Sequence, residues 1–96
     1  MAYIYPFKDA DEQLKLIIWK KGKPIPGFEE NVWRWDKCGH IMKYFDHGNT
    51  ESEYGWEIDH IYPSEGDNIS NLQPLNWQNN RDKGESVDWN CPQQIQ

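Results

Sequence analysis

The sequence contains few cysteines and no long apolar run. There are 2 cysteines among 96 residues, Cys38 and Cys91, and one such pair cannot complete the four-ligand set of a structural zinc site. No segment approaches the roughly 18–20 apolar residues that span a membrane, and the N-terminus lacks the charged and apolar regions of a signal peptide. These absences predict a cytoplasmic protein with reduced cysteines and no membrane partner. A Cys38–Cys91 disulfide bond is the alternative.

Apolar residues are also scarce, but aromatic rings are not. The hydrophobic share is 36% and the mean hydropathy is −1.02, whereas 15% of the residues are aromatic. Disordered chains are poor in aromatic residues, and each buried ring covers roughly 150–250 Å². The 6 Trp, 5 Tyr and 3 Phe therefore predict a small folded core. At ~100–200 residues per domain, residues 1–96 are expected to form one domain.

The net charge of −6 is unevenly distributed. Residues 13–43 carry a net charge of +4, and residues 44–96 carry −8. Affinity for phosphate backbones comes largely from cationic contacts, so the overall charge argues against non-specific nucleic-acid binding. The densest basic patch is Lys20, Lys21 and Lys23, which is either a contact for DNA or the solubilising end of a helix. The acidity also leaves open an interaction protein that mimics DNA.

The region before the central motif begins with a helical pattern. Residues 9–21 are predicted to be helical, with Asp9 and Glu12 as a capping box. The run 16–19 could alternatively form a strand. Residues 23–27 contain two prolines, which exclude a helix, so this segment is expected to be irregular.

A hairpin and a tail flank the central motif. Residues 32–45 favour two short strands because aromatic and β-branched residues are enriched there. The turn between the strands is expected at residues 36–40. The polar tail, residues 85–96, is expected to be flexible.

Residues 55–84 form the most informative stretch. Alternation over residues 56–60 predicts a short strand, and a loop rich in turn-forming residues follows it. After a second extended segment at 72–75, Asn76 is suited to cap a helix. Gly84 is suited to stop that helix. The predicted order is strand, loop, strand and short helix.

Three residues of this stretch, Asp59, His60 and Asn80, are candidates for a metal-dependent active site. Carboxylate and amide oxygens, as in Asp59 and Asn80, are the hard ligands that Mg²⁺ prefers. A neutral His60 beside them can take a proton from an attacking water. Adjacent strand residues point to opposite faces, so Asp59 and His60 can serve one cavity only where the strand twists or ends.

This string of residues resembles the motif of the HNH endonucleases, the ββα-metal finger of homing endonucleases, colicin DNases and RNA-guided nucleases. A lone Asp-His pair is weak evidence, but the ordered string of about 30 residues is specific. Around it, Trp35 to Gly39 and Tyr54 to Trp56 resemble a small HNH subgroup with no appended DNA-binding domain. The matching residues, in order, are Asp59-His60, Pro63, Gly66, Asn71-Leu72, Asn80 and Lys83-Gly84.

The resemblance implies a role for each matched residue. His60 matches the general base, and Asp59 and Asn80 match the two protein ligands of one divalent metal. Asn71 matches the middle Asn, which holds the loop and orients the histidine. Mg²⁺ is the expected ion, with Mn²⁺ or Ni²⁺ as alternatives. Candidate substrate contacts are the basic residues Arg81, Lys83, Lys20, Lys21 and Lys23.

Two positions depart from the family pattern. Many members bind a structural zinc through flanking cysteine pairs, but here Asn76 and Asn79 precede the final Asn and the earlier element has only Cys38. No structural zinc is therefore expected, and a tryptophan cluster is the proposed replacement. The usual Gly-Gly of the loop is Gly66-Asp67.

These observations predict a small α+β domain that contains a ββα-metal finger, an N-terminal helix and a β-hairpin. The resemblance implies a metal-dependent HNH endonuclease that hydrolyses phosphodiester bonds, with DNA favoured as the substrate. A chain this short has little surface for reading a base sequence, so specificity is expected to be low or supplied by a protein partner. The alternative is a non-catalytic module of the same fold that binds nucleic acid or protein.

Overall fold

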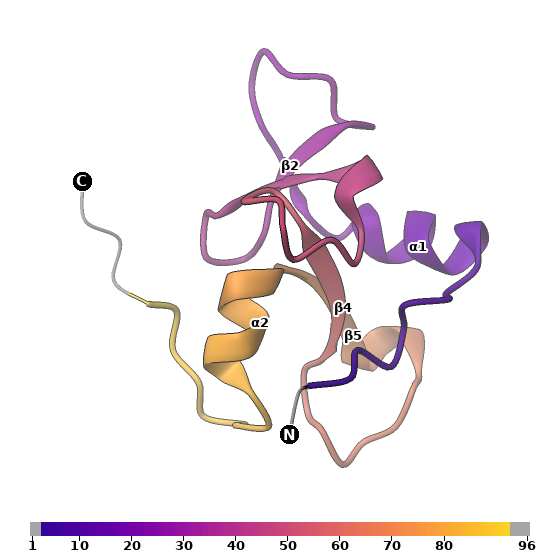
Figure 1. Cartoon of the computed structure of the whole chain (residues 1–96), viewed down its shortest axis with the longest axis vertical. Helices are drawn as coiled ribbons and strands as arrows, with labels where there is room; N and C mark the ends of the chain where they lie inside the picture. The colour runs from indigo at the N-terminus through magenta and orange to yellow at the C-terminus, as the bar shows by residue number, and fades with distance from the viewer. Residues whose placement is uncertain (1–2, 93–96) are drawn as a thin grey trace.

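Two small antiparallel sheets and two α-helices make up the fold in the computed structural model, which describes residues 3–92 (Figure 1). This arrangement confirms the expected small α+β domain. Short 3₁₀ turns at Tyr44–Asp46 and Ile69–Asn71 complete it. The elements are, in order, α1 (Glu12–Trp19), β1 (Lys23–Pro24), β2 (Trp33–Trp35), β3 (Ile41–Lys43), β4 (Trp56–His60), β5 (Leu72–Asn76) and α2 (Trp77–Lys83).

Helix α1 is shorter than the predicted span, residues 9–21. Its N-terminal cap is Asp11 and not Asp9, the predicted cap. The Asp11 side chain accepts a hydrogen bond from the backbone N–H of Leu14 at 2.8 Å and so caps the helix. Asp9 lies in a turn that follows Pro6, where the Ala10 N–H bonds back to the carbonyl of Phe7. Both aspartates are suitable caps, and the preceding turn selects the second.

The first sheet has the strand order β1–β2–β3. Its β2–β3 hairpin confirms the predicted pair of strands and the turn, with Arg34 paired to Met42. The predicted span of 32–45 is too long at its end, because residues 44–46 form a 3₁₀ turn. The expectation of an irregular segment at residues 23–27 is wrong for its first two residues, because Lys23 and Pro24 pair with β2. Proline is tolerated on an edge strand, where its missing N–H costs no ladder bond.

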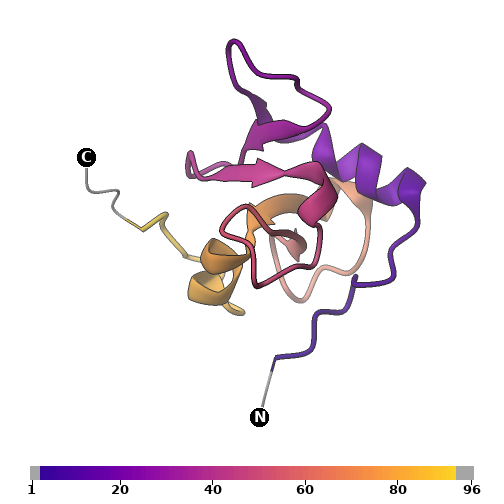
Figure 2. The ribbon, with the colours of Figure 1, turned by 45° about the horizontal axis from the view of Figure 1, so that its top comes forward.

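The second sheet and α2 form the predicted order of strand, loop, strand and helix. Strands β4 and β5 are antiparallel, with His60 opposite Leu72. Helix α2 follows β5 directly, and the Asn76 side chain accepts a hydrogen bond from the N–H of Gln78 at 3.0 Å. Gly84 ends the helix with a positive φ of 55°. In both ribbon views α1 and α2 lie on opposite sides of the β4–β5 pair (Figures 1 and 2).

The core is built from rings of separate elements. Trp19 of α1 lies 5.2 Å from Trp56 of β4, centroid to centroid, and 5.3 Å from Tyr44. The Trp56 indole N–H donates to the carbonyl of Tyr44 at 2.9 Å, which satisfies the polar end of a fully buried ring. The remaining buried members are Ile18, Met42, Ile58 and Leu72.

A buried carboxylate joins the hairpin to the β4–β5–α2 unit. Asp36, at the end of β2, is 1% exposed. Its donors come from its own turn and from the start of α2. We call this cluster the Asp36 junction. Its four hydrogen-bond donors, at 2.8–3.0 Å, are the backbone N–H groups of Cys38, His40 and Asn76 and the side-chain amide of Asn79.

The segment after α2 is attached to the rest of the fold. Cys38 and Cys91 form a disulfide bond, so the expectation of reduced cysteines is wrong. The Trp89 indole N–H also donates to the Asp82 carboxylate at 2.8 Å. The tail predicted to be flexible is therefore anchored at these positions, while residues 93–96 lie outside the described part of the chain. Within residues 3–92, no helix is long and apolar enough to cross a membrane.

Candidate active site

Asp59, His60 and Asn80 line one cavity of about 570 Å³. The two adjacent strand residues reach the same cavity because β4 ends at His60, where the chain turns into the loop. Asn80 reaches it from the second turn of α2. The fold thus brings together the three residues that the sequence singled out for chemistry.

Asp59 is a buried carboxylate, with 6% of its surface exposed. Its Oδ2 accepts a hydrogen bond from the Gln73 side-chain amide at 2.9 Å, from the opposite position on β5. Its Oδ1 lies 3.3 Å from the Lys83 ammonium. Burial raises the pKa of Asp59 above its ordinary value, and these two partners offset part of that rise. A further cation in the cavity would favour the charged form in the same way.

Lys83 is buried, and its ammonium group is bound to other residues of the protein. Its side chain is 3% exposed, and its ammonium also donates to the carbonyl of His60 at 2.8 Å. The sequence-based expectation that Lys83 contacts a substrate phosphate does not fit this position. A buried ammonium pairs with a buried carboxylate because either charge alone would be costly to desolvate.

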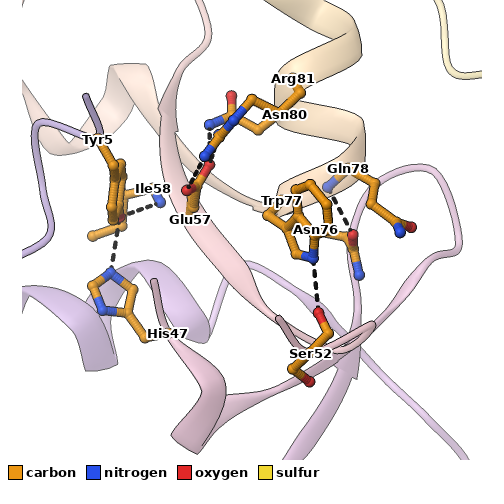
Figure 3. A network of polar contacts seen from close by, with 10 residues as sticks. All are labelled: Tyr5, His47, Ser52, Glu57, Ile58, Asn76, Trp77, Gln78, Asn80 and Arg81. Atoms are coloured by element: carbon orange, nitrogen blue, oxygen red, sulfur yellow. Dashed lines mark hydrogen bonds and ion pairs between the residues drawn. The ribbon is translucent and has the colours of Figure 1, made fainter. Parts of the chain in front are cut away.

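Asn80 and Arg81 both bind Glu57, a β4 carboxylate that is 1% exposed (Figure 3). The Asn80 amide nitrogen donates to Glu57 Oε1 at 2.8 Å. That bond fixes the amide orientation and leaves Oδ1 as the Asn80 atom available to a cation. The Arg81 guanidinium is bidentate on Glu57, with Nη2 at 3.0 Å from Oε2. Arg81 lines the cavity, but its charge is already balanced.

His60 is held on two sides. Its side chain is 25% exposed, and its Nε2 lies 2.6 Å from Oδ1 of Asp67 in the loop that follows β4. On another side, the Phe7 ring lies 5.2 Å from the imidazole, centroid to centroid. Among residues 3–92, the imidazole therefore has Asp67 as its polar partner and Phe7 as its aromatic neighbour.

Asn71 clamps the loop between β4 and β5. Its Oδ1 accepts a hydrogen bond from the N–H of Tyr62 at 3.0 Å. Its amide nitrogen donates to the carbonyls of Tyr62, at 3.0 Å, and of Gly66, at 2.8 Å. Asn71 thus holds both ends of the segment that precedes Asp67. Its side chain makes no described hydrogen bond to His60 within residues 3–92.

The three lysines of the predicted basic patch lie outside the cavity. Lys21 donates to the carbonyls of Leu72, at 2.7 Å, and Ile69, so it fixes the end of the loop. Lys20 and Lys23 have exposed positions at the end of α1 and in β1.

The N-terminal segment, which was not expected at the site, forms one wall of the cavity through Tyr3, Ile4 and Pro6. The Arg81 guanidinium lies 4.1 Å from the centre of the Tyr3 ring. Tyr5 accepts a hydrogen bond from the N–H of Ile58 at 2.6 Å and contacts His47 Nε2 at 2.8 Å (Figure 3). No local sequence pattern predicts this wall, because it depends on contacts of the segment with β4 and α2.

The donor set fits a hard divalent ion held partly by water and substrate. It offers one buried carboxylate, Asp59, and one oriented amide oxygen, from Asn80. Mg²⁺ is usually held by one or two carboxylates together with waters and phosphate oxygens. Within residues 3–92, no group of three or more His, Cys, Asp and Glu side chains gathers to hold a metal ion. Asp59 and Asn80 are the two oxygen donors that the sequence singled out and that line the cavity.

Comparison of the chain with protein-family models finds no match, and searches of curated proteins and of solved structures find none either.

Proposed function

We propose that the protein is a metal-dependent endonuclease of the HNH type that hydrolyses phosphodiester bonds, with DNA as the favoured substrate. The observation that carries the proposal is the shared cavity of Asp59, His60 and Asn80. A base, a carboxylate and an amide oxygen beside one open space are the groups that metal-assisted hydrolysis of a phosphodiester needs.

In this mechanism His60 takes the proton of the water that attacks phosphorus. A neutral imidazole nitrogen acts as the acceptor, and such proton transfer typically contributes about 10²–10⁴-fold to the rate. Asp59 and Asn80 would hold one divalent ion, which supplies Lewis-acid chemistry at a phosphate oxygen when bound. The P–O3′ bond breaks and the leaving 3′ oxygen takes a proton from water, so the products expected from the resemblance carry 5′-phosphate and 3′-hydroxyl ends.

The charges around the cavity favour a substrate that arrives with metal. Asp59 and Glu85 line the cavity, and Arg81 and Lys83 are neutralised by internal carboxylates. A phosphate therefore meets little uncompensated positive charge there until a cation is present. Activity and DNA affinity are expected to depend steeply on the divalent ion.

The test is nicking of supercoiled plasmid by purified protein with Mg²⁺, Mn²⁺ or EDTA. The expected result is nicking that requires metal and is lost in His60→Ala. His40→Ala is the matched control, because it removes a histidine side chain outside the cavity. Nicking that survives in His60→Ala would contradict the proposal. Intact plasmid, linear and single-stranded DNA with every metal would instead favour the non-catalytic binding module.

A further inference from the structure

We infer that Asp67 is the positioning residue for His60: its carboxylate accepts the Nε2 proton and leaves Nδ1 as the nitrogen that faces the attacking water. The inference rests on the proposed nuclease function, and it assigns a task to the residue that stands in place of the second loop glycine.

The contact itself fixes the direction of the hydrogen bond. Asp67 Oδ1 lies 2.6 Å from His60 Nε2. An ionised carboxylate can only accept, so the ring nitrogen must carry the proton. A neutral imidazole has one N–H and one lone pair, and the lone pair is then on Nδ1. Among the hydrogen bonds of residues 3–92, none is made by Nδ1, so that nitrogen is left to act as the acceptor.

The surroundings of His60 hold the ring without specifying its tautomer. Phe7 packs against the imidazole at 5.2 Å and makes no hydrogen bond to it. The peptide group between His60 and Ile61 is fixed at its C=O and at its N–H, because Lys83 donates to the carbonyl of His60 and the N–H of Ile61 donates to the carbonyl of Asn71. The other charged groups near the ring, Asp59 and Lys83, bond to each other. Asp67 is therefore the side chain that selects between the two tautomers.

The loop places Asp67 through backbone contacts, although its side chain is 75% exposed. Gly66 has a φ of +81°, a conformation that favours glycine. Its carbonyl accepts the Asn71 amide at 2.8 Å, and the N–H of Asn71 donates to the carbonyl of Asn68 at 2.8 Å. Asn71 thus acts on His60 through Asp67, because it stabilises the loop in which Asp67 lies.

The first test needs no activity. Nitrogen-15 NMR of the imidazole, in solution alkaline enough to keep the ring neutral, reports which nitrogen carries the proton. Wild type is expected to show His60 as the Nε2–H tautomer. In Asp67→Asn the amide can donate as well as accept, so both tautomers are expected. Glu65→Gln is the matched control, because it removes one exposed carboxylate of the same loop and should leave the spectrum unchanged. A wild-type ring protonated on Nδ1 would overturn the inference.

The second test measures cleavage by the same variants. Asp67→Ala and Asp67→Asn are expected to lower kcat about 10- to 100-fold, a part of the 10²–10⁴-fold supplied by a general base. KM should change less than about twofold, and the melting temperature should stay close to wild type, because the Asp67 side chain lies in solvent. Wild-type kcat in Asp67→Ala would overturn the inference while leaving the nuclease proposal intact. A protein that cleaves nothing would defeat the nuclease proposal, and the NMR result would still decide the role of Asp67.

Discussion

Asp36 and Asp59 are both buried carboxylates, but their surroundings differ. Asp36 follows β2 and bonds to the start of α2, whereas Asp59 lies on β4. Asp36 accepts four hydrogen bonds, two on each oxygen. Asp59 accepts one amide hydrogen bond from Gln73 and pairs with Lys83 at 3.3 Å. Only Asp59 lines the cavity of about 570 Å³.

The difference separates a carboxylate that holds structure from one that can bind a ligand. An ionised carboxylate has about four lone-pair sites. The donors of the Asp36 junction occupy all four, so Asp36 has no capacity left for a cation. Asp59 keeps about half of its capacity and faces open space. Burial alone therefore does not distinguish the two carboxylates, whereas unused acceptor sites beside a cavity make Asp59 the one that we propose as the ion ligand.

The largest effect on folding is expected from Asp36→Ala. The substitution leaves four donors without an acceptor. Two of them, the Asn76 N–H and the Asn79 amide, are buried and cost about 1–3 kcal/mol each, and the two half-buried donors add to that loss. We predict a loss of about 4 kcal/mol or more in the free energy of unfolding, measured by urea titration with tryptophan fluorescence. Asp88→Ala, at an exposed position, is the control and should change little. A junction variant within about 1 kcal/mol of wild type would mean that the donors find other partners.

Breaking the pair at Asp59 comes next. Lys83→Met leaves a buried carboxylate uncompensated, which typically costs about 3–5 kcal/mol. Replacing the carboxylate too, in the double variant Asp59→Asn and Lys83→Met, is expected to recover most of that loss. The same urea titration compares the single and double variants. No recovery in the double variant would show that Lys83 stabilises the fold through its packing or its bond to the His60 carbonyl instead.

The disulfide bond allows the Asp36 junction to be perturbed separately from Asp59, because Cys38 lies in the turn of that junction. Its partners are 53 residues apart in the sequence, and opening a loop of this kind typically costs about 2–4 kcal/mol. Cys91→Ser is therefore expected to lower the free energy of unfolding by that amount. The metal binding that we propose at Asp59 should be unchanged, because the disulfide bond lies outside the cavity. Loss of metal binding in a folded Cys91→Ser protein would contradict the separation of the two regions.

The smallest effect concerns His47, which pairs with Trp56 of β4 and lies outside the cavity. Burial lowers the pKa of His47 from 6.5 to about 4, with Lys15 adding to the shift. The unfolded chain therefore binds this proton more readily, so stability falls as the pH drops from about 6.5 to about 4. In His47→Gln, the glutamine side chain can still accept a hydrogen bond from the Tyr5 hydroxyl, but it does not titrate. The slope of the free energy of unfolding against pH should therefore be shallower than in wild type across that window. Equal slopes in repeated melts would show that His47 titrates alike in both states.

The elements that could be predicted from the sequence are those set by neighbouring residues. Asn76 caps α2 and Gly84 ends it because both signals act within one helical turn. Residues 56–60 have the alternating sequence of a strand, and they pair with residues 72–76 after the loop of residues 61–71. These local signals are sufficient to assign Asp59 and His60 to a strand and Asn80 to a helix, which is where they lie.

The features that could not be predicted depend on contacts between distant parts of the chain. The burial of Lys83 follows from its pairing with Asp59, 24 residues earlier. The disulfide bond brings Cys91 back to the β2–β3 turn, and the N-terminal rings pack against β4. No local pattern encodes such contacts. For the cap of α1, two aspartates are equally suitable by type, and the turn after Pro6 selects Asp11.

The most direct test of Asp59 as the ligand-binding carboxylate is a titration of Mn²⁺ into the protein without DNA, followed by the electron paramagnetic resonance signal of the unbound ion. We predict one Mn²⁺ bound per chain in wild type, lost in Asp59→Asn and retained in Asp88→Asn. Circular dichroism checks that each variant is folded. Binding that is equal in wild type and Asp59→Asn, or absent from both, would contradict this assignment.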